Sequence, residues 1–465
     1  MTIERQVNLW EQAQIAHSTA NWSLLLQCLQ QLIAQRSEGK EAEEIRSREA
    51  ERCAGENILV SSPGYPSTWA SQQAQLLSWA MDVLEFGDFH QRWDVAKLLP
   101  KLGKSAYTPL MEILADEDAD EELRWFSVRI LGNFNHADVI AALVELLKTS
   151  VSVEEKAMAA AALAEIGASA VAAITELLAE SDTRLLAVRS LSYIRHSETI
   201  APLLSVVRDP QIEVRAAAIE ALSSFHDSRI PPVLLNALDD LGASVRREAA
   251  IGLSFRPDLR EELDLVNRLL PRLYDLNLDV CIAAAIALGR LGTDAAATGL
   301  FQVLHSSHTP AVQIEIVRSL GRVGTENSLE YLRSSLNLLA SKTIWQEIVT
   351  VLGRIEQQQL KPLAAEILIE LLKSHHPATE NANVKQAIAM SLGQLGEIIA
   401  IDRLIQLLAD TDAAVRLHAI AALKQLAPET AYHKLEQMAR DTDLTPELQQ
   451  GVAIALQEWV ISESC

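Results

Sequence analysis

Few residues of this chain have the types and the spacing that catalysis or metal binding needs. His375 and His376 stand side by side, and a histidine pair in a loop can bind a metal ion, but no cysteine, aspartate or further histidine stands at ligand spacing. The tripeptide GKS at 103–105 lacks the glycine five residues upstream that a phosphate-binding loop carries. The motifs G-x-S-x-G and H-E-x-x-H do not occur. We therefore expect no catalytic residue, no metal site and no cofactor.

The chain contains a repeating sequence pattern, and the helices that it predicts must position any functional residue. A leucine near the end of an alanine- and valine-rich segment returns at intervals of 31 to 33 residues, apart from intervals of 28, 35 and 40. Such self-similarity indicates a repeat protein. These anchor leucines are Leu99, Leu131, Leu163, Leu191, Leu222, Leu253, Leu288, Leu320, Leu352, Leu392, Leu423 and Leu456.

Each repeat contains two predicted helices. The first is like residues 140–150 and the second like residues 214–225, with apolar residues three and four apart on one face. A polar turn separates them, and the second helix often ends at a glycine, which suits a left-handed C-cap. One such pair cannot bury its apolar face, whereas a stack of pairs can. We predict an all-α fold, a right-handed α-solenoid of about twelve helical hairpins over residues 69–465.

The first residues differ from the repeats. Residues 1–36 form a predicted N-terminal helical segment that carries Trp10 and Trp22. Residues 37–68 are charged and contain glycine and proline, which is typical of a linker or mobile loop. We expect the helical segment to cap the first repeat, and a partner-docking arm is the alternative.

Positions counted from the anchor leucines separate structural from surface residues. Arginine or lysine recurs seven residues before the anchor, and an aspartate often stands six residues earlier still, which predicts a structural Asp–Arg ladder through the turns. Positions two before and two after the anchor point about 160° away from it, toward an open face of the second helices. On this face we place the candidate partner-binding residues Phe126, Arg129, Arg189, Tyr193, Phe255, Arg290, Arg318, Arg322 and Arg354.

The arginines among them allow two interpretations. Arg290, Arg322 and Arg354, the arginine tract, follow the anchor by two residues in successive repeats, and Arg318 lies one turn before Arg322. They favour a groove for an acidic segment or a carboxylate ligand, or they pair with Glu315 and Glu347 on the same helices. The aromatic residues are of types enriched at interface hot spots, or they fill contacts between adjacent repeats.

Composition limits the partners. The net charge is −22 and the pI about 5.0, which argues against nucleic acid, because nucleic-acid binding needs Lys and Arg to neutralise phosphates. The four cysteines form no C-x-x-C pair and are interpreted as reduced thiols. No stretch of about twenty apolar residues and no signal-peptide layout occurs, so we expect a cytoplasmic protein without a membrane span.

The segments DPQIEVRAAAIEAL (209–222) and DTDAAVRLHAIAAL (410–423) carry a resemblance. Over about residues 90 to 465 the chain resembles HEAT repeats of the phycobilisome-lyase-like type, which implies HEAT-type hairpins and a cyanobacterial source. Such repeats serve scaffolds, chaperones and lyases. The first hypothesis is a non-catalytic protein-binding scaffold or adaptor that uses a concave face lined by the second helices.

The alternative, implied by the resemblance, is a phycobilin lyase or chromophore chaperone that acts on phycobiliproteins. The chain would be an enzyme only in that case. It would hold an open-chain tetrapyrrole, with the arginine tract on the propionates and Tyr193 or Phe255 beside the pigment. The di-iron motif of another HEAT-like family, the deoxyhypusine hydroxylases, is a repeated His-Glu dipeptide, and this chain contains none.

Overall fold

The computed structural model describes residues 2–35, 67–116, 118–307, 309–441 and 443–463. Throughout these ranges the secondary structure is helical, with no strand, which confirms the predicted all-α solenoid. The chain divides into two compact units, Met1–Asp209 (unit 1) and Pro210–Cys465 (unit 2). The predicted linker lies almost entirely outside the described residues. In the part of the chain that the structure describes, no helix is both long and apolar enough for a membrane span.

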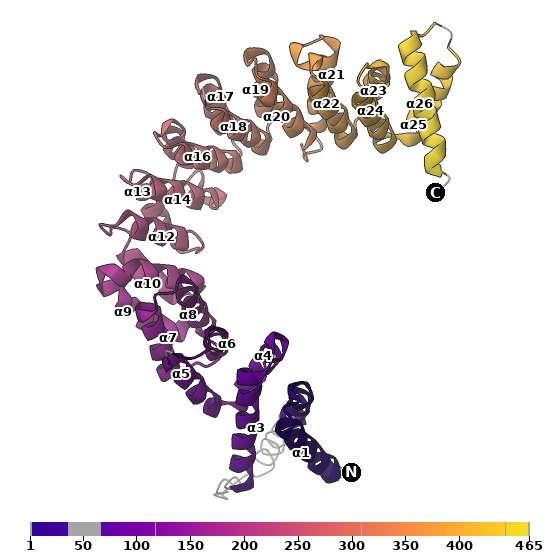
Figure 1. Ribbon diagram of the computed structural model, residues 1–465. Coiled ribbons are helices and arrows are strands. Elements are labelled where there is room, and N and C mark those ends of the chain that lie inside the picture. The colour runs from indigo at the N-terminus through magenta and orange to yellow at the C-terminus, as the bar shows by residue number, and fades with distance from the viewer. Residues whose placement is uncertain (1, 36–66, 117, 308, 442, 464–465) are drawn as a thin grey trace, which may run out of the picture. The chain divides into compact units, whose positions relative to one another are not determined.

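Unit 1 begins with helices ahead of the first repeat and continues in pairs (Figure 1). A helix over 22–35 follows α1. The elements with printed bounds are α1 (Thr2–Ser18), α3 (Ser67–Phe86), α4 (Phe89–Ala96), η1 (Leu99–Leu102), η2 (Lys104–Ala106), α5 (Tyr107–Ala115), α6 (Glu121–Leu131), α7 (Ala137–Thr149), α8 (Val153–Ile166), α9 (Ala168–Glu176), η3 (Leu177–Ala179), α10 (Ser181–Tyr193), η4 (Ser197–Thr199) and α11 (Ile200–Ser205).

Unit 2 continues the pairing. Its elements are α12 (Ile212–Leu222), α13 (Ile230–Ala237), α14 (Ala243–Ser254), η5 (Pro257–Leu259), α15 (Leu265–Leu269), η6 (Leu270–Tyr274), α16 (Leu278–Leu291), α17 (Asp294–Ser306), α18 (Pro310–Val323), α19 (Glu326–Leu338), α20 (Lys342–Gly353), α21 (Lys361–Lys373), η7 (Pro377–Glu380), α22 (Ala382–Leu395), η8 (Ile398–Ala400), α23 (Ile401–Gln406), η9 (Leu407–Ala409), α24 (Ala413–Leu426), α25 (Pro428–Ala439) and α26 (Pro446–Glu463).

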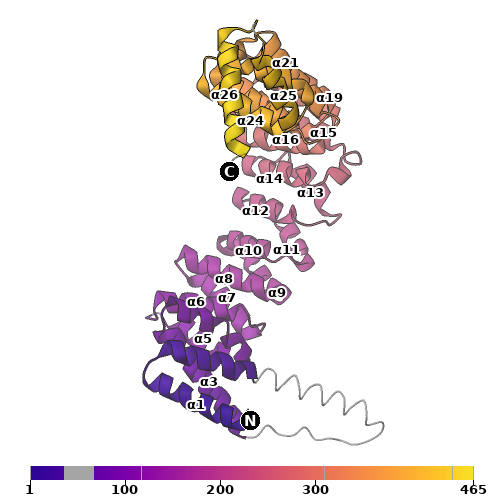
Figure 2. The ribbon, with the colours of Figure 1, turned by 90° about the vertical axis from the view of Figure 1, so that its right-hand side faces the viewer.

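Within each unit the helices form two layers (Figure 2). The even-numbered helices from α4 onward are the second helices of their repeats. From α4 to α10 in unit 1 and from α12 to α24 in unit 2, each packs on the next second helix, as α14 does on α16. The odd-numbered first helices form the other layer. The anchor leucines explain the stacking, because all of them up to Leu423 are fully buried between the layers. Burying one such side chain contributes about 1.5–3 kcal/mol.

The helix ends follow the local sequence. Turn residues such as Asp120, Ser152 and Asn277 accept a hydrogen bond from a backbone N–H of the first turn of the helix that follows. At the other end Gly292 and Gly324 adopt positive φ angles of 66° and 62°, which confirms the predicted glycine C-caps.

A ladder of ion pairs connects the turns of neighbouring repeats. Arg184 pairs with Asp209 at 2.5 Å, Arg215 with Asp240 at 2.6 Å, and Lys385 with Asp410. The arginines also donate to carbonyl groups of their own turn, as Arg184 does to Leu178. The predicted ladder is therefore present, but Arg184, Arg215, Arg246 and Lys385 each pair with the aspartate of the following repeat rather than with that of their own.

In three repeats of unit 2, the ladder position holds an uncharged hydrogen-bond donor in place of an arginine or lysine. Cys281 donates to the carbonyl of Asp275 at 3.2 Å, Gln313 to Ser307 at 2.9 Å, and the Trp345 indole to Leu336 at 3.0 Å. All three stand seven residues before an anchor leucine, as the ladder cations do. What the fold requires at this position is a hydrogen-bond donor for the turn.

Small residues bring the second helices close together. An added Cβ at Gly289 would lie 3.0 Å from the Cα of Ser319, and one at Gly353 would lie 2.3 Å from the Ser391 hydroxyl oxygen. Each of these glycines directly follows an anchor leucine and faces the residue directly before the next anchor. This glycine contact occurs in unit 1 as well, between Gly132 and Ala162.

The N-terminal helices lie against α3 and α4. The rings of Trp10 and Trp79 are 5.4 Å apart, and those of Trp22 and Phe86 are 5.9 Å apart. His17 Nε2 lies 2.8 Å from a carboxylate oxygen of Asp82. Trp79 is buried, and the capping role of the N-terminal segment stays a prediction.

Candidate protein-binding surface

The open face of the second helices holds most of the candidate residues. Tyr193 at the end of α10 is 60% exposed and Phe255 at the end of α14 is 52% exposed. The remaining surface residues among the candidates are arginines, and all of them are exposed: Arg129, Arg189, Arg290, Arg318, Arg322 and Arg354. The first three candidates along this face, Arg129, Arg189 and Tyr193, belong to unit 1, and the others belong to unit 2.

Phe126 does not lie on this surface, so the prediction that placed it there is wrong. The side chain is fully buried, and the rings of Trp125 and Phe89 lie 4.9 and 5.6 Å from its own. It stands five residues before its anchor, where the neighbouring second helix covers it. The same position in unit 2 holds Glu315 and Glu347, whose side chains are only 12% and 19% exposed. A helical wheel drawn for one helix misses this cover.

A cluster of two tryptophans and an arginine lies on α4 and α6, and sequence reasoning missed its aromatic part. Trp93 and Trp125, both partly exposed, stack with ring centroids 6.3 Å apart and an interplanar angle of 26°. The guanidinium of Arg129 lies 4.4 Å from the Trp93 centroid and 5.8 Å from that of Trp125. We call these three residues the Trp–Arg cluster. Phe89, half exposed, stacks on Trp93 and extends it.

The sequence contains a signal for the Trp–Arg cluster. Trp93 and Trp125 each stand six residues before an anchor leucine in consecutive repeats. Equivalent positions on adjacent second helices lie side by side, since the helices of a repeat stack are about 8–10 Å apart. Comparison of that one position across repeats predicts the stacked pair.

The arginine tract and Arg318 make four arginines on this face, and two of them form ion pairs with glutamates. Arg318 Nε donates to Glu347 at 2.7 Å, and Arg322 Nη1 donates to Glu315 at 2.8 Å. The ion-pair interpretation therefore holds for these two. The side chain of Glu315 is nearly buried, so the pair is partly shielded from solvent.

The other two arginines have no carboxylate partner among the described residues. Arg290 donates to the hydroxyl of Ser254 at 2.8 Å, and its guanidinium lies 4.9 Å from the ring centroid of Phe255. Arg354 ends α20 and stays exposed, with no ion pair inside the described ranges. The open face of unit 2 thus retains two arginines that are available to an anionic group.

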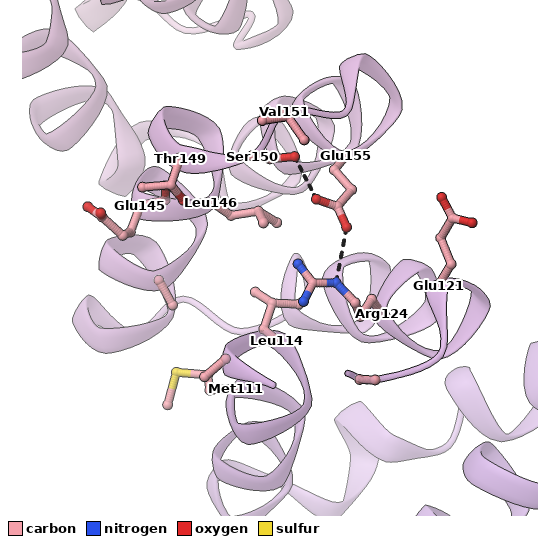
Figure 3. Close-up of a pocket in the computed structure, with 13 residues that line it drawn as sticks. Met111, Leu114, Glu121, Arg124, Glu145, Leu146, Thr149, Ser150, Val151 and Glu155 are labelled. Carbon is pink, nitrogen blue, oxygen red and sulfur yellow. Dashed lines mark hydrogen bonds and ion pairs between the residues drawn. The ribbon is translucent and has the colours of Figure 1, made fainter. Parts of the chain in front are cut away.

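A groove of unit 1 lies elsewhere, along the turns (Figure 3). It has a volume of about 680 Å³ between α5, α6, α7 and the start of α8. Figure 3 shows Arg124 and Ser150 converging on the carboxylate of Glu155, at 3.0 and 2.6 Å. The hydrogen bond from Ser150, with that from Arg124, lowers the pKa of Glu155. Since Arg124 occupies the ladder position of its repeat, we assign this group to the fold rather than to ligand binding.

The histidine pair also has a local role. His376 Nδ1 accepts a hydrogen bond from the backbone N–H of Ala378, and its ring lies edge-on to Trp345 at 5.4 Å. Within the described ranges, no group of three or more His, Cys, Asp or Glu side chains is arranged to hold a metal ion.

Two layers of paired helices joined by a repeating ladder define an α-solenoid. The HEAT repeats family matches residues 107–185, 174–254, 266–341 and 365–457, which is more than half of the chain. The chain belongs to the HEAT-repeat family. This match does not distinguish subtypes, so the phycobilisome-lyase-like type stays a prediction.

Among the solved structures compared, importin beta has the same fold. Importin beta, crystallised in an ammonium sulfate condition, is 14% identical with a TM-score of 0.52 over 83% of this chain, and this chain spans 61% of the importin beta chain. An engineered protein is 21% identical with a TM-score of 0.32, over 76% of this chain and 98% of its own. Human deoxyhypusine hydroxylase is 21% identical with a TM-score of 0.25, over 55% and 95%. No curated protein sequence matches the chain.

Proposed function

We propose that this chain is a non-catalytic scaffold or adaptor that binds other proteins along the open face of its second helices. The observation that carries the proposal is the Trp–Arg cluster, in which Arg129 lies over the stacked rings of Trp93 and Trp125 at the surface. Tryptophan and arginine are the residue types most enriched at interface hot spots.

The cluster suits a protein partner for a physical reason. Stacking on the rings holds the Arg129 guanidinium in one place, so that less side-chain freedom is lost when a partner binds. The rings supply a large apolar area, and its removal from water contributes about 25 cal/mol per Å². Arg129 forms no ion pair with a described residue, so its charge is available to a carboxylate or a carbonyl group.

Two features support a concave surface on this side of each unit. The glycine contacts bring neighbouring second helices close together, whereas the first helices of unit 2 pack less extensively on one another. A stack that is narrower on one side curves toward that side. In unit 2 the second helices from α12 to α24 follow the inner side of the ribbon (Figure 1).

The test is affinity capture from an extract of the source cell with the full chain as bait. The Trp93→Ala/Trp125→Ala variant and the milder Arg129→Glu variant are compared with wild type. The control is Val151→Ala/Val153→Ala, which removes highly exposed apolar side chains from a turn of the same unit. Hot-spot truncation costs about 2 kcal/mol or more, or roughly thirtyfold in affinity.

A partner retained by wild type and control but lost from both cluster variants supports the proposal. Circular dichroism confirms that the variants fold, and Arg129→Glu leaves both rings in place. Equal capture by all four proteins, or no specific capture by any, contradicts it. Adding an open-chain tetrapyrrole to the purified chain tests the lyase or chaperone alternative, which requires a change in visible absorbance. The cytoplasmic location and cyanobacterial source rest on the sequence alone.

A further inference from the structure

A small polar groove crosses the open face of unit 2, well apart in sequence from the Trp–Arg cluster. It lies between α20, α22 and α24 and has a volume of about 270 Å³. Gln346, Asn383, Gln394 and Arg354 line it, and Met390 contributes an exposed apolar side chain. We call it the amide groove.

The charge of the amide groove is opposite to that of the chain. None of the residues that line it carries a carboxylate, and Arg354 brings a full positive charge. Of the acidic residues around it, Glu347 on α20 pairs with Arg318, and Glu315 on α18 pairs with Arg322. Asp412, before α24, accepts a hydrogen bond from the lining Gln386 at 3.4 Å. A guanidinium recognises a carboxylate through two parallel hydrogen bonds, so an anionic carboxylate is the group that Arg354 fits best.

The amides indicate what surrounds that carboxylate. Each Asn or Gln side chain offers both a hydrogen-bond donor and an acceptor, which matches the N–H and C=O groups of an extended peptide backbone. Gln346, Asn383 and Gln394 are exposed, and no hydrogen bond of their side-chain amides occurs within the described residues. The groove is too small for a helix, whose diameter is about 10–12 Å with its side chains.

The register of the repeats gives the direction of the peptide. Arg354 and Gln394 stand at the same position of consecutive repeats, two residues after Leu352 and Leu392. Packed helices are about 8–10 Å apart, and an extended chain rises about 3.3 Å per residue. A peptide that crosses the second helices therefore advances about three residues from Arg354 to Gln394.

We propose that the amide groove binds an extended peptide segment with an aspartate or glutamate side chain, which pairs with Arg354 while Gln394 contacts the backbone about three residues away. This inference rests on the proposed scaffold function and names the chemistry of one of its partners. The negative charge of the whole chain makes nucleic acid a poor alternative ligand.

The experiment uses a phage-displayed library of random octapeptides selected on the full chain. The expected result is an enrichment of sequences with an acidic residue. The best of these, made with a fluorescein label, should bind Arg354→Gln at least tenfold more weakly by fluorescence polarisation. Lys342→Gln, which removes an exposed cation from the start of the same helix, should stay within twofold of wild type.

Two further measurements test whether the peptide binds in the amide groove. Replacing its acidic residue by glutamine should weaken binding to wild type but not to Arg354→Gln, because the two changes remove the same contact. Ala387→Trp should fill the groove and abolish binding, with folding checked by circular dichroism. A lysine in the peptide should restore binding to Arg354→Glu.

Selection without acidic enrichment, or equal affinity for wild type and Arg354→Gln, overturns the inference. Its failure is distinguishable from that of the scaffold function. If a cellular partner is captured through the Trp–Arg cluster but no acidic peptide binds, only the inference about the amide groove is contradicted. If peptide binding depends on Arg354 but no partner is captured through the cluster, only the proposed binding role of the Trp–Arg cluster is contradicted.

Discussion

Arg246 and Asp275 join two neighbouring repeats through a pair of parallel hydrogen bonds. Arg246 Nε donates to Oδ2 at 2.8 Å and Nη2 donates to Oδ1 at 2.7 Å, and only 6% of the aspartate side chain is exposed. Loss of one partner leaves the other charge nearly buried, so Asp275→Asn should lower the free energy of unfolding by about 3 kcal/mol at pH 7. Urea denaturation measures this, with the exposed Asp279→Asn as a control that stays close to wild type.

The same pair predicts a pH dependence. The hydrogen bond from Arg246 lowers the pKa of Asp275 below its ordinary value of 3.8. Its contribution is therefore fully present above that value and is lost as the pH falls through the folded-state pKa. The difference between wild type and Asp275→Asn should shrink below pH 3.8. A difference that stays constant down to pH 2 would show that the carboxylate charge is not what stabilises the folded protein.

Gly321 and Val351 provide a test of the glycine contacts. An added Cβ at Gly321 would lie 2.2 Å from Val351 Cγ1 and 3.6 Å from its Cβ, so the clash involves one methyl group. Valine is stiff at χ1 in a helix and cannot easily turn away. Overpacking by Gly321→Ala should cost about 1–3 kcal/mol, set against about 1 kcal/mol gained in helix propensity.

Val351→Ala removes that methyl group. In a double-mutant cycle, Gly321→Ala should be at least about 1 kcal/mol less destabilising in the Val351→Ala background than in wild type. Thermal and urea denaturation of the four proteins give the coupling energy. Strictly additive effects would mean that the helices move apart without strain, and the glycine would then have no spacing role.

Gln313 tests whether the ladder position needs a donor rather than a charge. Its amide donates to the carbonyls of Leu304 and Ser307 at 3.2 and 2.9 Å. Gln313→Met keeps the length of the side chain but leaves these carbonyls without that donor, which should cost about 1–3 kcal/mol. Gln302→Met, at an exposed position of α17, should change stability by less than about 0.5 kcal/mol. Equal effects of the two substitutions would rule out the donor role.

Glu315 should control the electrostatic field around the amide groove. Glu315→Gln removes the partner of Arg322 and makes the open face more basic. Two charges about 10 Å apart in water interact by about 0.4 kcal/mol, so affinity for the acidic octapeptide should rise about twofold at low salt. The gain should vanish in 0.5 M salt, where the Debye length is about 4 Å. Glu326→Gln, on a first helix, should produce no gain.

The repeat itself was predictable from the sequence. Burial of one leucine in each repeat produces a period that is visible without any structure, and Leu131 through Leu423 all prove to be buried. The ladder was predictable as well, because Arg184 and Asp209 stand at positions that recur. Its pairing across repeats was not, since a column of residues does not indicate which neighbour each side chain reaches.

The surface was predicted less well, and the reason is physical. A helical wheel gives the direction of a side chain but not what an adjacent helix places in front of it. Phe126 was assigned to the open face and is covered by Phe89 and Trp93. Arg322 was correctly placed at the surface, but Glu315 neutralises it. The role of Gly289 as a contact between helices depends on the distance to Ser319, which no single-helix pattern contains.

The glycine contact has a consequence for how such a chain can change its length. In unit 2 the repeats anchored by Leu288, Leu320 and Leu392 carry a glycine directly after the anchor and a small residue directly before it. Gly289 meets Ser319 in this way, and Gly393 meets Ala422. Because both halves of the joint are carried by every such module, duplication of one module creates a new joint identical to those already there. Deletion of one rejoins two edges that already match. Gene rearrangement can therefore lengthen or shorten the array in whole modules, without compensating mutations in its core.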